Sequence, residues 1–243
     1  MKITLGGNVC IRNGIDLDYC WREAIKSLLP VCDEVVVCDG ESTDGTQEEI
    51  REWAKVEPKL KLCVYPWPDP KGDIDFWVNW LNYARRHIKS DFQIQLDADE
   101  VLDDKSYPTL HRFREMDYPQ HFSVWCDRFN FWKDHRHLIP HGVCLGDRVI
   151  RIAPQSVWLP SDGPHPNGAE CVMMARELHP TIKIFHYGFL RKPGAFFKKA
   201  HALQEFFWNS YDKRLLAVED DPNWMENIKD VEWTGALNDY DGH

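Results

Sequence analysis

The sequence predicts an α/β domain of three layers, with helices on both faces of a mostly parallel mixed sheet. One observation behind this prediction is that strand-like and helix-like segments alternate three times along the first part of the chain. Another is that the next strand-like segment, Phe92 to Asp97, runs directly into Asp97-Ala98-Asp99. Ligands of parallel sheets bind at the carboxyl ends of strands, so the acidic pair is expected at the functional edge.

Periodicity places the elements of the first half. Alternating or continuous apolar residues favour strands at Lys2–Ile11, Glu34–Cys38 and Lys59–Tyr65. Helical spacing of apolar residues favours helices at Leu17–Leu29, Thr46–Lys55 and Ile74–Ile88. Their expected start signals are Asp16 or Asp18 as a cap for the first helix and Thr46-Gln47-Glu48-Glu49 as a capping box for the second.

The pattern loosens after Leu102. Strands are expected at His121–Cys126, Arg148–Ile152 and Ile182–Phe185, and a helix from Pro193 to about Asp212. The intervening segments Asp134–His141 and Ser161–Gly168 are predicted as loops. The predicted organisation is a first half over residues 1–102 that ends in the acidic pair, a second half of mixed strands and a helix over 103–217, and an acidic extension over 218–243.

Composition excludes some classes of function. The net charge of −10 disfavours a general binder of nucleic acid or anionic membranes. The stretch from Leu178 to Gln204 has no acidic residue and several basic ones, which favours a local site for an anionic ligand. Eight cysteines without a CxxC pair favour a reducing compartment. With no apparent signal peptide and no apolar run of membrane-spanning length, a cytoplasmic location is expected.

The acidic pair has the chemistry of a cation site. Alternation along a strand puts Asp97 and Asp99 on the same side of the chain, with the small Ala98 between them. Mg²⁺ and Mn²⁺ prefer oxygen ligands and commonly share their coordination shell with water and substrate phosphates. We therefore expect Mn²⁺ or Mg²⁺ as the cofactor.

Four segments together carry a family resemblance. They are Arg12-Asn13, then Asp33 to Thr46, then Asn82-Tyr83-Ala84, then Leu96-Asp97-Ala98-Asp99-Glu100. In this order and spacing they resemble the inverting glycosyltransferases of family 2, which have the GT-A fold of nucleotide-diphospho-sugar transferases. The good match covers about residues 3 to 102, and a looser one continues through Asp147 to Arg151 and His186-Tyr187-Gly188.

The resemblance implies a glycosyltransferase (hexosyl- or pentosyltransferase) that moves a sugar from a nucleotide-diphosphate donor to an acceptor hydroxyl with inversion. A UDP-sugar is the default donor. Asp97, Asp99 and His186 are the expected metal ligands. The expected donor-binding residues are Arg12, Asp39 and Asp97, with Arg191 and Lys198 closing over the diphosphate.

Inversion also requires a base that accepts the proton of the acceptor hydroxyl. The candidates are Asp162 and His165, with Asp162 preferred because a carboxylate is usual in the family. Related sequences have a carboxylate directly after the histidine, whereas here His165 stands between Pro164 and Pro166. The acceptor stays open between a glycan, a lipid-linked sugar, a protein and a modified nucleobase.

Three other functions have weaker support in the sequence. A zinc-dependent hydrolase would use His135, His137 and His141, beside Asp134. A sugar-phosphate nucleotidyltransferase would need a glycine-rich basic loop after the first strand, which Leu5 to Val9 does not supply. A non-catalytic module that only binds nucleotide-sugars is the remaining alternative, against which the intact acidic pair argues.

Overall fold

The computed structural model describes residues 2–67, 74–117, 122–132, 134–139, 148–155, 175–206 and 238–239. The elements in chain order are β1 (Leu5–Ile11), α1 (Trp21–Leu28), β2 (Glu34–Asp39), α2 (Thr46–Ala54), β3 (Leu60–Val64), α3 (Ile74–Arg86), β4 (Phe92–Asp97), β5 (Glu100–Leu102), a 3₁₀ turn (Asp104–Ser106), α4 (Tyr107–Phe113), β6 (Val124–Trp132), β7 (Asp134–Leu138), β8 (Arg148–Pro154), β9 (Ile182–His186), α6 (Pro193–Phe206) and β10 (Asn238–Asp239). The predicted α/β class is confirmed.

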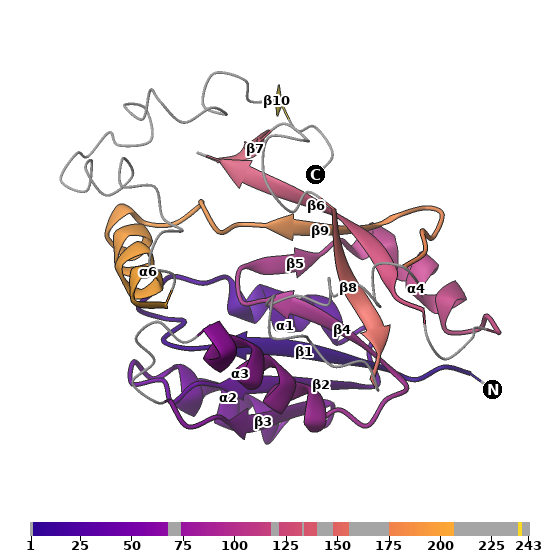
Figure 1. Ribbon diagram of the computed structural model, residues 1–243, viewed down its shortest axis with the longest axis horizontal. Helices are drawn as coiled ribbons and strands as arrows, with labels where there is room; N and C mark the ends of the chain where they lie inside the picture. The colour runs from indigo at the N-terminus through magenta and orange to yellow at the C-terminus, as the bar shows by residue number, and fades with distance from the viewer. Residues whose placement is uncertain are drawn as a thin grey trace.

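The described strands form one mixed sheet in the order β10-β7-β6-β8-β4-β1-β2-β3, with β9 lying against β6 and β5. Strands β1 to β4 pair in parallel, β8 runs antiparallel to β4, and β9 runs parallel to β6. As a result, the carboxyl ends of β1, β2, β4 and β9 face the same edge of the sheet, on the left of Figure 1.

Helices cover the two faces of the parallel half differently. On one face, α1 packs against the sheet through Trp21, Ile25 and Leu28, which join the largest core cluster. On the other face, Trp80 and Ala84 of α3 pack against a row of thiols that lie in register on neighbouring strands. That row is Cys10, Cys38 and Cys63. This packing is the observed counterpart of the three predicted layers.

The loops that follow β1 and β2 hold each other through one side chain. The carboxylate of Asp44 accepts a hydrogen bond from Thr46 N at 3.0 Å and others from Ile15 N at 2.9 Å and Asp16 N at 2.8 Å. Gly45, with a φ of 94°, stands immediately before α2. The predicted capping box is therefore wrong, because the N-cap is Gly45 and Thr46 is already the first residue of the helix; Asp44 accepts the hydrogen bond of Thr46 N and also fixes the turn after β1.

Three further expectations are corrected. The first helix begins at Trp21, since Asp18 has a φ of 52° and its neighbours form a turn, so neither Asp16 nor Asp18 caps it. The segment Asp134–Leu138, predicted as a loop, pairs with β6 as strand β7. The strand expected at His121–Cys126 instead runs from Val124 to Trp132. None of the helices in the described ranges is long and apolar enough to span a bilayer.

Candidate active site

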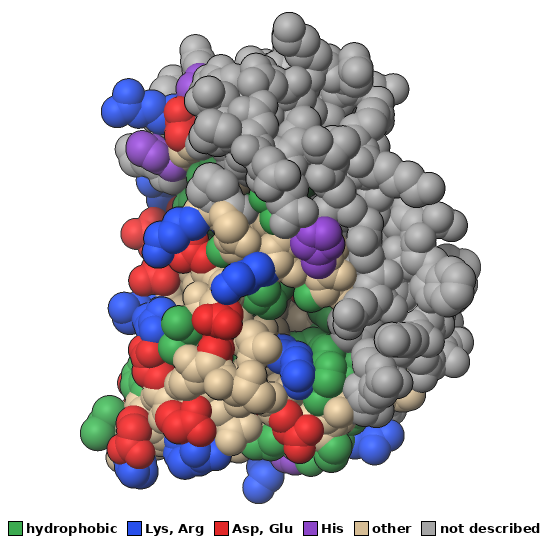
Figure 2. All heavy atoms as spheres, turned by 90° about the vertical axis from the view of Figure 1, so that its left-hand side faces the viewer, with side chains coloured by type: hydrophobic (Ala, Val, Ile, Leu, Met, Phe, Trp, Pro, Cys, Tyr) green, Lys and Arg blue, Asp and Glu red, His purple; other side chains and the backbone are tan. Residues whose placement is uncertain are grey.

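A cleft of about 340 Å³ opens at the carboxyl ends of the parallel strands. Its lining comes from β1 and its following loop, from the loop after β3, from α3, from the turn after β4, and from β9 and α6. Figure 2 looks at this edge and shows a hollow bordered by basic and hydrophobic side chains. The cleft has a carboxylate end, around Asp97, Asp99 and His186, and an aromatic end, around Arg12, Trp67 and Trp80.

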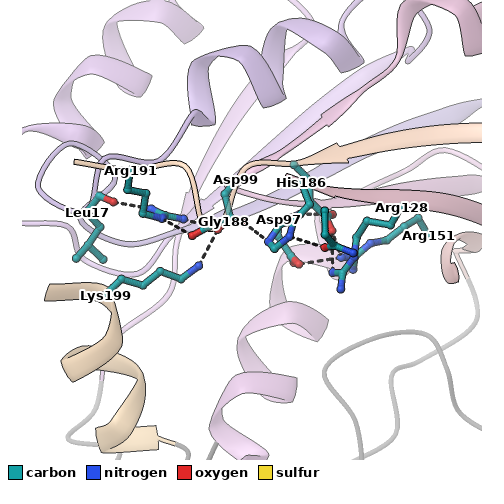
Figure 3. Close-up of polar contacts among 11 residues, drawn as sticks. Leu17, Asp97, Asp99, Arg128, Arg151, His186, Gly188, Arg191 and Lys199 are labelled. Atoms are coloured by element: carbon teal, nitrogen blue, oxygen red, sulfur yellow. Dashed lines mark hydrogen bonds and ion pairs between the residues drawn. The ribbon is translucent and has the colours of Figure 1, made fainter. Parts of the chain in front are cut away.

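The two aspartates of the acidic pair lie in different surroundings. Asp97 ends β4, and its Oδ2 accepts a hydrogen bond from Arg151 of β8 at 2.8 Å. Asp99 lies in the turn before β5 and is 4% exposed. Figure 3 shows Arg151 beside Asp97, and Arg191 and Lys199 on the opposite side, at Asp99.

Two basic groups share one oxygen of Asp99. Its Oδ2 accepts from Arg191 and, at 2.7 Å, from the Nζ of Lys199. Burial alone would raise the pKa of Asp99, but the adjacent positive charges outweigh it and hold the pKa far below its usual range. Asp99 is therefore ionised at any physiological pH. The acid-free stretch identified in the sequence supplies both of these bases.

His186, at the end of β9, completes this group. Its Nδ1 lies 2.8 Å from the side-chain oxygen of Asn130, so Nδ1 carries the proton and Nε2 keeps its lone pair. Nε2 lies 3.8 Å from Asp99 Oδ1. Burial lowers the pKa of His186 to about 3, against the opposing attraction of Asp99. The imidazole is therefore neutral, which is the form that binds metals.

Gly188 leaves the space that the imidazole needs. A Cβ at this position would lie 2.3 Å from His186 Nε2 and 3.2 Å from Asp99 Oδ2. Both distances are shorter than ordinary contacts, so a larger residue would displace His186 from Asp99. The small residue after Tyr187 is thus part of the site geometry.

Behind the acidic pair lies a second buried charge group. Glu100 and Arg151 are both fully buried and joined by a hydrogen bond of 2.5 Å. Arg128 of β6 lies 3.2 Å from the same carboxylate, and the other oxygen of Glu100 accepts from Asp97 N at 3.0 Å. Because Arg151 binds both Glu100 and Asp97, it fixes the orientation of the turn that carries the acidic pair.

These donors fit a hard divalent cation in part. Asp99 Oδ1 and the neutral Nε2 of His186 face each other with lone pairs, and carboxylate and imidazole are accepted ligands of Mn²⁺. Within the described ranges, however, no three such side chains converge on one point, because Asp97 is turned towards Arg151. A cation held here would take its remaining ligands from water and substrate phosphates, as Mg²⁺ and Mn²⁺ commonly do.

The aromatic end is built around one arginine. The guanidinium of Arg12 lies over the ring of Trp67, 4.3 Å from its centroid, and donates to the carbonyl oxygens of Gly40 and Glu41. Trp67 meets Trp80 edge to face at 5.2 Å and covers Gly40, where a Cβ would lie 2.7 Å from the indole. Flat rings and a guanidinium plane are surfaces on which a nucleobase or a sugar ring can stack.

Asp39 lies close by but faces away from this surface. Its carboxylate is fully buried and accepts from Ser42 N at 2.8 Å and Gln47 Nε2 at 2.7 Å. It is absent from the described lining of the cleft. The expected contact between Asp39 and the nucleotide therefore stays a prediction.

The other predicted residues are distributed as follows. Arg191 precedes α6 and binds Asp99. Lys198 lies within α6, and its side chain is exposed. His137 pairs with Asp134 at 2.7 Å, and His135 is exposed. The proposed bases Asp162 and His165, and His141 of the zinc hypothesis, lie outside the described residues.

Sequence reasoning missed several residues of this site, among them Glu100, Arg151 as the partner of the acidic pair, and Lys199. For Lys199 a signal existed. The buried residues of α6 include Phe196 and Ala200, and Lys199 lies between them at helical spacing, on the side of the helix that faces the sheet. Helical phase thus distinguishes Lys199 from the exposed Lys198.

Two solved structures, one of them from Pyrobaculum calidifontis, are examples of proteins with a similar structure. The mannosyltransferase PcManGT of that organism, in complex with GDP-Man and Mn²⁺, is 24% identical with a TM-score of 0.41, and the match covers 53% of this chain and 36% of that one. S. aureus TarS 1–349 is 15% identical with a TM-score of 0.47, covering 89% of this chain and 70% of that one. The chain thus spans little more than a third of the length of the mannosyltransferase.

Comparison with protein families gives a clearer result. None of the curated proteins compared with the chain matches it. The model of glycosyl transferase family 2 matches residues 20–140, a range that contains the acidic pair and Asp39. Five residues of the site lie outside the matched range, and the fold brings them next to the acidic pair or into the cleft. They are Arg12, Arg151, His186, Arg191 and Lys199. The structure agrees with this match, because its mostly parallel mixed sheet carries the acidic pair at the end of β4. The chain belongs to glycosyl transferase family 2 and has the GT-A fold.

Proposed function

We propose that the chain is a glycosyltransferase that moves a sugar from a nucleotide-diphosphate donor to an acceptor hydroxyl with inversion. The observation that carries this proposal is a single cleft with a buried carboxylate and a neutral imidazole at one end and a stacked arginine and indole at the other. These two ends suit the two ends of such a donor. Membership of family 2 supports the class of reaction.

Asp99, His186 and Asp97 are the residues that would hold a divalent cation. When bound, Mn²⁺ or Mg²⁺ neutralises the charge that develops on the leaving diphosphate. Asp99 offers Oδ1 and His186 offers Nε2, and Asn130 keeps the imidazole in the tautomer that leaves Nε2 available. Arg151 holds Asp97 and thereby the turn between the two aspartates.

The aromatic end is assigned to the nucleoside. Arg12 and Trp67 offer a stacking surface, and Asp39 would contact the base or ribose after exchanging a hydrogen bond from Ser42 or Gln47. Uridine is the default base from the family resemblance. The sugar, hexose or pentose, is set by residues that the geometry does not single out.

Asp162 or His165 would accept the proton of the acceptor hydroxyl. The chemistry requires one such base on the side of the sugar opposite the leaving group. The acceptor remains open between a glycan, a lipid-linked sugar, a protein and a nucleobase. The zinc-hydrolase hypothesis gains no support from the described histidines, because His137 is paired with Asp134 and His135 points to the surface.

Calorimetric titration with UDP, GDP and CDP, each with and without Mn²⁺, tests the proposal. We expect one nucleotide to bind in the presence of Mn²⁺, and this binding to be lost in Asp99→Ala. The matched control is Asp16→Ala, a substitution of an exposed aspartate in the turn after β1. If no nucleotide binds, or if Asp99→Ala binds as tightly as Asp16→Ala, the proposal is wrong.

A further inference from the structure

We propose that Lys199 is an exchangeable counter-ion, which holds Asp99 in the free protein and moves to the diphosphate when nucleotide and cation bind together. The inference rests on the proposed function and names the side chain that recognises the diphosphate. It also implies that the cation and the nucleotide bind cooperatively.

The first step is that the two bases on Asp99 are held very differently. Arg191 is fully buried, donates to the carbonyl oxygens of Leu17 at 2.5 Å and Gly188 at 2.9 Å, and lies over the ring of Tyr19. If the guanidinium of Arg191 moved away from Asp99, it would also lose its hydrogen bonds to these two carbonyl oxygens and its contact with Tyr19. Arg191 is therefore a fixed partner of Asp99.

Lys199 has far fewer contacts with the part of the chain that the structure describes. There its ammonium donates one hydrogen bond, to Asp99 Oδ2 at 2.7 Å, and lies 5.4 Å from the ring of Tyr19. Its side chain is 13% exposed and lines the cleft, which Arg191 does not. A lysine ammonium on its flexible stem can change partners with a small movement, and it is a common phosphate ligand.

The second step concerns charge. In the free protein the carboxylate of Asp99 already faces two positive groups, so a divalent cation that arrives alone meets repulsion from Lys199 at the same carboxylate. A diphosphate brings negative oxygens into the cleft. Lys199 can then bind these oxygens, which leaves Asp99 with Arg191 alone and makes its other oxygen a better ligand.

The consequence is thermodynamic linkage. If nucleotide raises the affinity for Mn²⁺, Mn²⁺ must raise the affinity for nucleotide by the same factor. Lys199 is the group that creates this coupling, because it lowers the affinity for the cation in the free protein and raises the affinity for the diphosphate in the complex.

Lys199→Met tests the inference, with Lys89→Met as the matched control. Lys89 is exposed, precedes β4 and is absent from the described lining of the cleft, so its loss removes the same charge from the chain without touching Asp99. Binding of Mn²⁺ alone is measured by electron paramagnetic resonance, and binding of the nucleoside diphosphate in saturating Mn²⁺ by calorimetry. Thermal unfolding verifies that each variant is folded.

We expect opposite changes in the two measurements. Lys199→Met should bind Mn²⁺ alone at least about fivefold more tightly than wild type and the diphosphate at least about tenfold more weakly, in line with the loss of a charge-assisted hydrogen bond. Lys89→Met should match wild type in both. If Lys199→Met does not fold, Lys199→Gln replaces it, because its amide can still donate to Asp99.

Other outcomes overturn the inference. Weaker binding of Mn²⁺ alone would mean that Lys199 only supports the site, and unchanged binding of the diphosphate would mean that Lys199 never reaches it. If the wild-type protein binds a diphosphate but Lys199→Met and Lys89→Met behave alike, the inference fails while the proposed function stands. If the wild-type protein binds no nucleotide, both fail.

Discussion

At the carboxylate end of the cleft, acidic and basic side chains are buried together, whereas at the aromatic end one half-buried arginine lies on an indole ring. The carboxylate end joins residues from β4, β8 and β9 and from the chain around α6. Among the described residues, those that form the aromatic end lie between Arg12 and Trp80. One end therefore depends on the whole fold and the other on its first half.

The difference teaches how each end responds to substitution. Removing one member of a buried ion pair leaves an uncompensated charge and typically costs about 3–5 kcal/mol. Removing an arginine from an exposed ring costs about 0.5–1 kcal/mol. The carboxylate end should therefore fail as a unit, and the aromatic end should lose function gradually.

The largest effect is expected for Arg151→Met. Because Arg151 is fully buried between Glu100 and Asp97, its loss should lower the free energy of unfolding by about 3–5 kcal/mol. Denaturant unfolding measures this. The control is Arg148→Met on the same strand, whose ion pair with Glu177 is exposed and should contribute less than about 1 kcal/mol. Equal losses for the two variants would contradict the assignment.

Gly188→Ala should have the next largest effect. The new Cβ collides with His186, so we expect a loss of stability of about 1–3 kcal/mol and a drop of roughly tenfold in nucleotide affinity in Mn²⁺. Gly194→Ala, in the first turn of α6, is the matched control because nothing lies within 4 Å of its Cβ position. Unfolding and calorimetry should show Gly194→Ala to be close to wild type; an equally mild Gly188→Ala would show that the imidazole can move freely.

A smaller effect is expected from pH. Burial keeps the pKa of His186 at about 3, below the 6.5 of an unperturbed histidine. At pH 5.5 an ordinary imidazole is about nine-tenths protonated, whereas that of His186 in the folded protein stays neutral. Affinity for a nucleotide-sugar in Mn²⁺ should change by less than about twofold between pH 7.5 and 5.5. A nucleotide-sugar is used because its diphosphate does not titrate in this range.

The same shift affects stability in a defined direction. Between pH 6.5 and about 3 the unfolded chain binds a proton at this histidine that the folded chain does not, so His186 makes folding less favourable as the pH falls through this window. A tenfold loss of nucleotide affinity by pH 5.5 would mean that His186 titrates normally and that the site is more open than the geometry indicates.

The smallest effect is expected for Arg12→Met, the same substitution made at the aromatic end. Arg12 is half-buried and lies over Trp67, so its loss should lower the free energy of unfolding by about 1 kcal/mol or less. Denaturant unfolding of Arg12→Met and Arg151→Met under one set of conditions compares the two ends directly. A cost for Arg12→Met as large as that for Arg151→Met would remove the distinction between them.

Local patterns were sufficient to predict the parallel half. Apolar alternation in β4 and the acidic pair at its end are properties of neighbouring residues, and the structure has β4 at Phe92–Asp97 as expected. Strand β7 was missed because Asp134-His135-Arg136-His137 carries no apolar alternation. Its pairing with β6, rather than its own sequence, makes it a strand.

The partners of the acidic pair could not be predicted for a different reason. Arg151 lies 54 positions from Asp97, and Lys199 lies 100 positions from Asp99. No periodicity links residues at such separations, and only the sheet order, with β8 beside β4 and β9 beside β5, brings them together. Glu100 was noted only as the residue after the motif, although it is fully buried with Arg151.

These long separations have a consequence for the order in which the protein is made. During synthesis the first half of the chain emerges with Asp97, Asp99 and Glu100 well before Arg151, Arg191 and Lys199 exist. Carboxylates without counter-charges stay hydrated, so this edge of the nascent sheet should remain open until β8 and α6 dock. A fragment ending at Asp117 should therefore keep strands β1 to β4 but leave the carboxylate end unformed.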